Sequence, residues 1–336
     1  MINVVSRQAH VRETTGPQKV YANLLKGLDR IGYPYVVNRT LDATTRLWIQ
    51  DDVEVLSYMH RTDAKTIVGP NLFCLPRDVP DNISLDGALY IQPSEGISRL
   101  WRQLGFDRCP FVAWPAGIDT DEFRPSTLSA SSRQILVYHK ERSAAELQAI
   151  ESMLDRRDLS YRVLRYGSYR EAEFRELLDS TSFVIWHGRH ESQGIAFEEV
   201  LACDIPVLLC DVSCLGDDES AYEYESSELP LQVTAAPYFD ETCGIRILGI
   251  GGLGEALDEV LDGVGSYRPR EFVLRNLSLE GQARAFVRLW NHFGLTLDDG
   301  YAERLRNQKG LTAPVSYKAG RAFRRLESAL ARRVRR

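Results

Sequence analysis

Short apolar runs alternate with segments of helical periodicity along most of this chain. Ile2–Val5 begins the series as a strand. The helix that follows has Val20, Leu24 and Leu28 on one face. Further strands are predicted at residues 35–37, 47–49, 66–68, 89–91, 111–113, 135–138, 161–165, 183–186 and 206–209. Runs that are apolar on successive residues are typical of strands buried on both faces, so the pattern predicts an α/β fold in which helices cover parallel sheets.

A polar segment divides the chain into two halves. Residues 125–132 contain one Pro, one Thr and four Ser, which indicates a linker. A chain of 336 residues is also long enough for two domains of about 150 residues each. We therefore expect two Rossmann-like domains, residues 1–128 and 129–300, followed by a separate tail of residues 301–336.

Composition and charge narrow the class of protein. Hydrophobic residues make up 44% of the chain and charged residues 26%, which is ordinary for a globular protein and excludes disordered or collagen-like classes. The net charge of −6 hides an asymmetry. Residues 303–336 carry eleven Lys and Arg against two Glu, a charge of +9, and leave −15 on residues 1–302. So acidic a body is a poor general binder of nucleic acid, and we expect no nucleic-acid partner.

The start of the chain and its cysteines favour a cytoplasmic protein. Residues 1–6 are too short and too uncharged for a secretory signal, and no apolar run approaches the roughly 18–20 residues of a membrane-spanning helix. The six cysteines form no C-x-x-C pair. We interpret them as buried thiols of a reducing compartment rather than as a metal site or a disulfide framework.

The polar loop after the strand at 183–186 is the strongest candidate for a binding site. Ligands of open α/β sheets bind at the carboxyl ends of strands, where loops lead into helices. Gln193, Gly194 and Ile195 would open the next helix, whose free backbone N–H groups attract an anion. Glu191 lies just before this helix and Glu199 about two turns inside it. Carboxylates so placed suit two hydroxyl groups of one ligand with a phosphate between them, and a polar surface loop without function is the alternative.

The same loop and helix carry a recognisable motif. The sequence ESQGIAFEEVLACDIPV, residues 191–207, resembles the E-x7-E signature of retaining GT-B glycosyltransferases, the family 4-like group also called glycosyl transferases group 1. Both acids and Gly194 are kept. Gln193, Ala196 and Asp204 replace the family's usual aromatic residue, Pro and Gly, and these departures bear on donor preference.

Two further segments support this resemblance. WPAGIDTDEFRP, residues 114–125, looks like the segment that ends the family's first domain, and TTGP, residues 14–17, looks like its N-terminal glycine loop. The resemblance implies two Rossmann-like domains facing a cleft, with a C-terminal helix packing back on the first domain. Residues 1–128 would then face the acceptor, and residues 129–300 would bind the nucleotide sugar.

The resemblance also implies an activity. The chain would move a sugar from a nucleotide-sugar donor to a saccharide or lipid-linked acceptor, with retention of the anomeric configuration. It would need no cofactor and no metal, and UDP- or GDP-linked sugars are the expected donors. The departures from the family pattern leave a catalytically inactive nucleotide-sugar-binding protein as an alternative.

Individual residues receive roles from the resemblance. Glu191 would bind hydroxyls of the donor sugar, the backbone of residues 193–195 would meet sugar and phosphate, and Glu199 would hold the ribose. Lys140 and Arg142 follow the strand at 135–138, where a point charge and a planar fork would neutralise the leaving diphosphate. Their alternative is that both are solvated residues at the start of the next helix.

Other assignments concern the edges of the donor site. Gly16 of the glycine loop would face the donor phosphates, and the turn Tyr166-Gly167 would lie near the base. The family often has a catalytic His after the strand that corresponds to residues 66–68, but residues 69–71 here contain none. His10 and His60 are the nearby candidates, although a lone His is more often structural or solvated.

Two sequence patterns suggest competing functions. GIGGLG, residues 249–254, matches the G-x-G-x-x-G of NAD(P)-dependent oxidoreductases, but no strand ending in an acid follows about 20 residues later, so we interpret it as a structural turn. Asp119-Thr120-Asp121 matches the metal-binding D-x-D of the other glycosyltransferase fold. Its position inside the segment that ends the first half argues against a metal site.

The basic tail has two interpretations. Residues 315–336 form an apolar helical stripe flanked by Lys and Arg, which could lie on anionic lipid headgroups at about 1 kcal/mol per basic residue. The alternative is a helix that packs on the first domain. Because acceptors of the family are often lipid-linked, we favour membrane contact, which would place a cytoplasmic protein peripherally on the inner face of the membrane.

Overall fold

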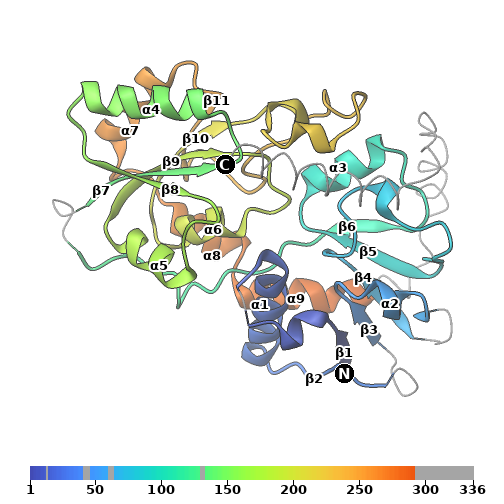
Figure 1. Cartoon of the computed structure of the whole chain (residues 1–336). Helices are drawn as coiled ribbons and strands as arrows, with labels where there is room; N and C mark the ends of the chain where they lie inside the picture. Colours follow the sequence, from blue (N-terminus) through green and yellow to red (C-terminus); the bar gives the residue numbers. More distant parts are fainter. Residues whose placement is uncertain (13, 41–45, 60–63, 129–132, 292–336) are drawn as a thin grey trace.

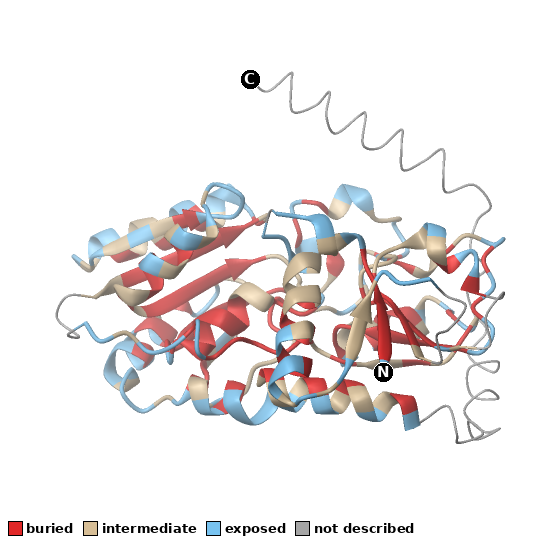
Figure 2. Ribbon diagram, turned by 90° about the horizontal axis from the view of Figure 1, so that it is seen from below, coloured by how far each residue is buried: buried red, intermediate tan, exposed pale blue. Residues whose placement is uncertain are grey.

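The computed structural model describes residues 1–12, 14–40, 46–59, 64–128 and 133–291. Within them, two parallel β-sheets lie side by side, each covered by helices (Figure 1). The strands of both sheets are largely buried (Figure 2). The predicted α/β class with two Rossmann-like halves is therefore confirmed.

Among the described residues, the first sheet has six parallel strands in the order β2-β1-β3-β4-β5-β6. They are β1 (Ile2–Val5), β2 (Tyr35–Val37), β3 (Arg46–Ile49), β4 (Lys65–Val68), β5 (Ala88–Gln92) and β6 (Phe111–Ala113). Helices α1 (Gly16–Arg30), α2 (Val53–Leu56) and α3 (Glu95–Gln103) lie between them along the chain. Alternate side chains of each strand face opposite ways, so Val4 and Trp48 pack in the core on the α1 side, while Val5 and Ile49 pack in the core that contains Trp101 of α3.

The second sheet, again within the described residues, has five parallel strands in the order β11-β10-β9-β7-β8. They are β7 (Gln134–Lys140), β8 (Tyr161–Arg165), β9 (Thr181–Gly188), β10 (Val207–Asp211) and β11 (Gly244–Leu248). Helices α4 (Ala144–Arg156) and α7 (Leu253–Gly263) contribute to the core on one face. Helices α5 (Glu171–Asp179), α6 (Ile195–Ala202) and α8 (Pro269–Asn276) contribute to the core on the other face.

The chain returns to the first sheet at its last described helix, α9 (Leu279–Leu289), which runs beside α1 (Figure 1). Phe286 of α9 packs against Trp48 and Trp114, with ring centroids 5.2 and 5.0 Å apart. A Cβ on Gly27 of α1 would lie only 2.6 Å from the carbonyl oxygen of Leu279, so the two helices can pack this closely only because residue 27 has no side chain. The resemblance implies a C-terminal helix that packs back on the first domain, and α9 packs there. The expected domain boundaries place the residues of α9 in the second domain, residues 129–300.

The sequence patterns located the elements well. Every strand predicted from an apolar run is present, with ends shifted by at most two residues. Residues 129–132 of the expected linker and the whole tail 301–336 lie outside the described residues. Of the helices that are described, none is both long enough and apolar enough to span a bilayer.

Candidate active site between the two sheets

The loop between β9 and α6 is held in a defined shape. Gly194 is the N-cap residue of α6 and has a left-handed backbone, with φ of 90°, a conformation that residues other than glycine rarely adopt. The backbone N–H of Glu191 donates to the carbonyl of Thr234 at 3.0 Å. The loop that carries Glu191 therefore runs from the carboxyl end of β9 to the N-terminus of α6.

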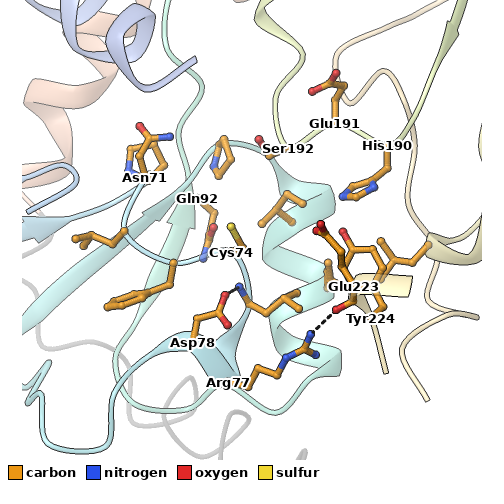
Figure 3. A pocket seen from close by; sticks show the side chains of 18 of the residues that line it. Asn71, Cys74, Arg77, Asp78, Gln92, His190, Glu191, Ser192, Glu223 and Tyr224 are labelled. Atoms are coloured by element: carbon orange, nitrogen blue, oxygen red, sulfur yellow. Dashed lines mark hydrogen bonds between the residues drawn. The ribbon is translucent and has the colours of Figure 1, made fainter. Parts of the chain in front are cut away.

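A cavity of about 520 Å³ lies beside this loop and has walls from both halves of the chain. Residues 70–78 and 92–100 of the first half contribute one side, and residues 189–192 and 215–224 the other. Figure 3 shows Gln92, Cys74 and Asp78 on one side, with Glu191 and His190 across from them. The volume falls within the range of about 300–1,000 Å³ that is common for small-ligand sites.

Lys140 and Glu191 form an ion pair at this cavity. Lys140 ends β7, and its Nζ lies 2.5 Å from Oε1 of Glu191. The same ammonium sits over the ring of Tyr166, 4.3 Å from its centroid. The structure thereby brings together three residues that the sequence assigned to one site. Gly167, in the same turn as Tyr166, has a positive φ of 78°.

Glu199 lies apart from the cavity, against the first half of the chain. Both of its carboxylate oxygens accept hydrogen bonds from Nζ of Lys19 on α1, at 2.6 and 2.7 Å. Lys19 also donates to Glu171, at the start of α5, at 2.7 Å. Burial raises the pKa of Glu199 to about 8 against the opposing charge of Lys19. The proposed ribose carboxylate is therefore occupied by a lysine of the other half.

Arg142 is buried, with 3% of its surface exposed. Its guanidinium donates to the backbone carbonyls of Gly188 and Cys210, at 3.3 and 3.2 Å, and to Glu146 at 3.0 Å. It thus joins the ends of β9 and β10 to the start of α4. This position differs from that of Lys140, because here the guanidinium binds protein groups rather than facing the cavity.

A pair of buried histidines is linked to Arg142 through Glu146. Nε2 of His187 lies 2.9 Å from the Glu146 carboxylate, and its Nδ1 lies 3.0 Å from Nδ1 of His139. Burial lowers the pKa of His139 to about 4 and also lowers that of His187. Both rings are therefore neutral at pH 7, and the network fixes the orientation of Arg142.

Gln193, which replaces the family's aromatic residue, connects the loop to the chain between the two sheets. Its side-chain amide accepts from the N–H of Ala116 and donates to the Ala116 carbonyl, both at 2.9 Å. It also donates to Glu198 at 2.8 Å. Burial raises the pKa of Glu198 well above its ordinary value, which favours the neutral form of this carboxyl. Ile195, two residues on, packs in the cores of both halves.

The remaining sequence candidates are placed as follows. Gly16 begins α1 next to Pro17, which lines the cavity. His10 is exposed at the end of a short 3-10 helix, η1 (Arg7–His10), and His60 lies outside the described residues. Asp119 is buried and pairs with Lys26 and Arg30 on α1, at 3.1 and 3.0 Å, which accounts for its burial without a metal.

Two departures from the sequence patterns have clear structural reasons. Asp204 replaces the family's Gly but keeps a left-handed backbone, with φ of 60°, and its carboxylate accepts the N–H of Arg270 at 3.1 Å. In the GIGGLG segment, Gly252 caps α7 with φ of 79°. Residues 269–276 then form α8 rather than the second strand of a dinucleotide site, which disfavours the oxidoreductase alternative.

Within the described residues, no group of three or more His, Cys, Asp or Glu side chains is arranged to hold a metal ion.

Sequence reasoning missed two features of the site. Lys19 carries no motif, and its partner Glu199 lies 180 residues away. The other feature is the connection between β10 and β11, residues 212–243, which reaches the first half: the Tyr238 hydroxyl donates to the carbonyl of Pro93 at 2.9 Å. This connection also supplies Asp218, whose carboxylate binds His190.

By sequence, the chain matches no protein-family model and no curated protein sequence. Its fold is similar to that of sucrose-phosphate synthase from Thermosynechococcus elongatus, at 13% identity and a TM-score of 0.56, over 87% of this chain and 98% of that one. Anabaena HepE, solved in complex with UDP-glucose, aligns at 10% identity and 0.53, over 87% and 99%. The catalytic domain of Arabidopsis thaliana starch synthase IV, bound to ADP and acarbose, aligns at 10% identity and 0.52, over 87% and 98%. At these identities the likeness establishes the fold, which is the GT-B architecture of glycosyltransferases, and membership of the E-x7-E family stays a prediction.

Proposed function

We propose that this chain is a glycosyltransferase that transfers a sugar from a nucleotide sugar to a hydroxyl group of a saccharide or lipid-linked acceptor, with retention of configuration and without a metal or cofactor. The observation that carries the proposal is the placement of Glu191. Its carboxylate lines a cavity shared by the two halves, pairs with Lys140 and shortly precedes the N-terminus of α6, which no side chain of the described residues caps. Carbohydrate hydroxyls are good partners for such a carboxylate, and phosphates are good partners for such a helix end.

The donor would lie along α6. Glu191 would accept hydrogen bonds from hydroxyls of the transferred sugar, and the N–H groups at residues 193–195 would bind phosphate oxygens. Glu199 would bind the ribose once Lys19 has left it. A UDP- or GDP-linked sugar is the donor we favour, and the capture of UDP-glucose by HepE and of ADP by starch synthase IV, two proteins of the same fold, supports a nucleoside diphosphate.

In the transfer step, a bond forms between an acceptor oxygen and the anomeric carbon while the bond from that carbon to the diphosphate breaks. The electron pair of the broken bond leaves with the diphosphate. Lys140 is the cation beside Glu191, and it would stabilise this developing negative charge. Arg142 would act less directly, because its contacts with the ends of β9 and β10 hold the strand ends that carry the site.

A screen of nucleotide sugars tests this proposal. Thermal unfolding would be followed with UDP-, GDP-, ADP- and dTDP-linked sugars and, in parallel, with NAD⁺ and NADP⁺. We expect one class of nucleotide sugar to raise the midpoint temperature and the dinucleotides to have no effect. Proton NMR of the product then reports whether the anomeric configuration is retained. Stabilisation by NAD⁺ or NADP⁺ alone, or an inert chain that neither transfers nor hydrolyses the bound sugar, would overturn the assignment.

The tail is a separate part of the proposal. Residues 315–336 would bring the enzyme to an anionic membrane that carries a lipid-linked acceptor, from the cytoplasmic side. Sedimentation with vesicles containing phosphatidylserine measures this directly. Binding that is lost in a chain ending at residue 300 is expected, and equal binding with and without the tail would contradict it.

A further inference from the structure

His190 lines the cavity immediately before Glu191, on the wall that the second half contributes. In Figure 3 its ring points toward Glu223 and Tyr224, which lie below it, and the Glu191 side chain lies above it. Only 12% of the His190 side chain is exposed. The ring of Tyr224 packs against it edge to face, with centroids 6.0 Å apart. The imidazole is therefore held in one place rather than free in solvent.

Asp218 fixes both the backbone and the side chain of His190. One carboxylate oxygen accepts the backbone N–H of His190 at 3.0 Å, and the other accepts the proton of its Nδ1. The Asp218 side chain has no exposed surface. A carboxylate on Nδ1 selects the tautomer in which Nε2 carries the free lone pair. Among the residues that the structure describes, none makes a polar contact with Nε2, so this lone pair is available to a ligand.

The opposite wall of the cavity lacks an imidazole. Pro70 and Asn71, which follow β4, line the cavity at the place where the resemblance leads one to expect a His. His190 thus supplies, from the second half, the one imidazole among the described residues that line this cavity. It directly precedes Glu191, whose carboxylate would hold the donor sugar, and both residues line the same cavity.

We propose that His190, oriented by Asp218, is the catalytic base of the transfer: its Nε2 accepts a hydrogen bond from the acceptor hydroxyl and takes its proton. This inference rests on the proposed function and adds the proton acceptor to it. As the O–H bond breaks, its electrons serve the new bond from oxygen to the anomeric carbon. The electrons of the old bond leave with the diphosphate, and the imidazolium later returns its proton to water. Asp218 is a positioning residue, because it acts through the ring.

The test compares three variants of the full chain. His190→Ala removes the base, Asp218→Asn replaces one of the two acceptor oxygens that hold His190 by an NH2 donor, and Glu176→Gln changes an exposed residue of the second half as a control. Transfer from the preferred nucleotide sugar would be measured with maltose, lactose and methyl glucoside as acceptors. Donor hydrolysis, in which water replaces the acceptor, would be measured alongside. Calorimetry would give the affinity for the donor.

We expect His190→Ala to lower kcat about 100-fold or more and Asp218→Asn about tenfold or more, with donor affinity within twofold of the wild type. Glu176→Gln should behave as the wild type. Added imidazole should restore part of the activity of His190→Ala, a result that a merely structural role would not produce. Wild-type rates in both cavity variants, or a loss that imidazole does not rescue and that parallels lost donor affinity, would overturn the role of His190. Failure of the proposed function looks different, because the wild type itself would then neither bind nor turn over a nucleotide sugar.

Discussion

The contact between Lys19 and Glu199 gives the most informative single substitution. Lys19→Met keeps the length of the side chain and removes the ammonium that now binds both oxygens of Glu199 and one of Glu171. The Lys19 side chain is 15% exposed and that of Glu199 only 2%, so the pair is largely shielded from water. Although burial opposes it, the charge of Glu199 and then that of Glu171 raise the pKa of Lys19, which keeps the ammonium charged at neutral pH.

Removing this cation should lower the free energy of unfolding by about 1–3 kcal/mol, because hydrogen bonds to charged groups are lost while Glu199 can take up a proton. For a chain of 336 residues, with an unfolding entropy of about 2.1 cal/mol/K per residue, that corresponds to a drop of roughly 1–4 °C in the midpoint of thermal unfolding. Lys26→Met is the matched control on the same helix. Its side chain is 48% exposed where it pairs with Asp119, so we expect a loss of no more than about 1 kcal/mol.

The proposed function adds a second expectation for Lys19→Met. If ribose must displace Lys19 from Glu199, the variant should bind the donor nucleotide roughly tenfold more tightly although it is less stable, because the unliganded form has lost a competing contact. Scanning fluorimetry and calorimetry measure the two quantities on the same samples. Donor affinity that falls together with stability would refute the reasoning, since Lys19 would then belong to the binding site.

Three further outcomes follow from the structure. Burial raises the pKa of Glu199 from 4.5 to about 8, so between these values the folded chain holds a proton that the unfolded chain releases. The contribution of Glu199 to the free energy of unfolding should therefore fall as pH rises from about 5 to 8, by at most about 1.4 kcal/mol per pH unit. Glu199→Gln should flatten this dependence of stability on pH, measured by urea unfolding. Arg142→Lys should lower stability by about 2–3 kcal/mol in the same assay, since an ammonium cannot reach two carbonyls and Glu146 together; unchanged stability with lost activity would instead place the guanidinium on the leaving group. Gly27→Ala should lower the free energy of unfolding by about 1–3 kcal/mol, because its new Cβ would clash with the carbonyl of Leu279. Gly96→Ala is the control: its new Cβ would meet its nearest atom at 3.6 Å, so this variant should be as stable as the wild type or slightly more stable. Equal thermal midpoints for the two variants would argue against the packing of α1 on α9.

The fold was predictable because buried parallel strands leave a strong trace in the sequence. Runs such as residues 135–138 and 183–186 are apolar at every position, which is typical of parallel strands buried on both faces. The packing of α9 on the first half was harder to predict. Its periodicity shows one apolar face, but nothing in that pattern says which of two cores the face covers.

The site was predictable only where local order decides it. Lys140 and Glu191 follow neighbouring strands, β7 and β9, so their meeting follows from the order of strands in the sheet. Lys19 meets Glu199 only because the two halves dock as they do. Asp218 lies in an irregular connection without periodicity, and its contact with His190 therefore had no signal in the sequence.

Turnover of the preferred donor by Glu191→Gln and Glu199→Gln tests most directly whether these two acids grip a nucleotide sugar. Each variant keeps the shape of the side chain and replaces its carboxyl group by an amide, and Glu176→Gln, an exposed acid of the second half, serves as the control. We predict that both site variants lose at least roughly tenfold in kcat/KM, because each loses a carboxyl oxygen that binds a ligand hydroxyl, while the control stays at the wild-type rate. Wild-type turnover in both Glu191→Gln and Glu199→Gln would contradict the account.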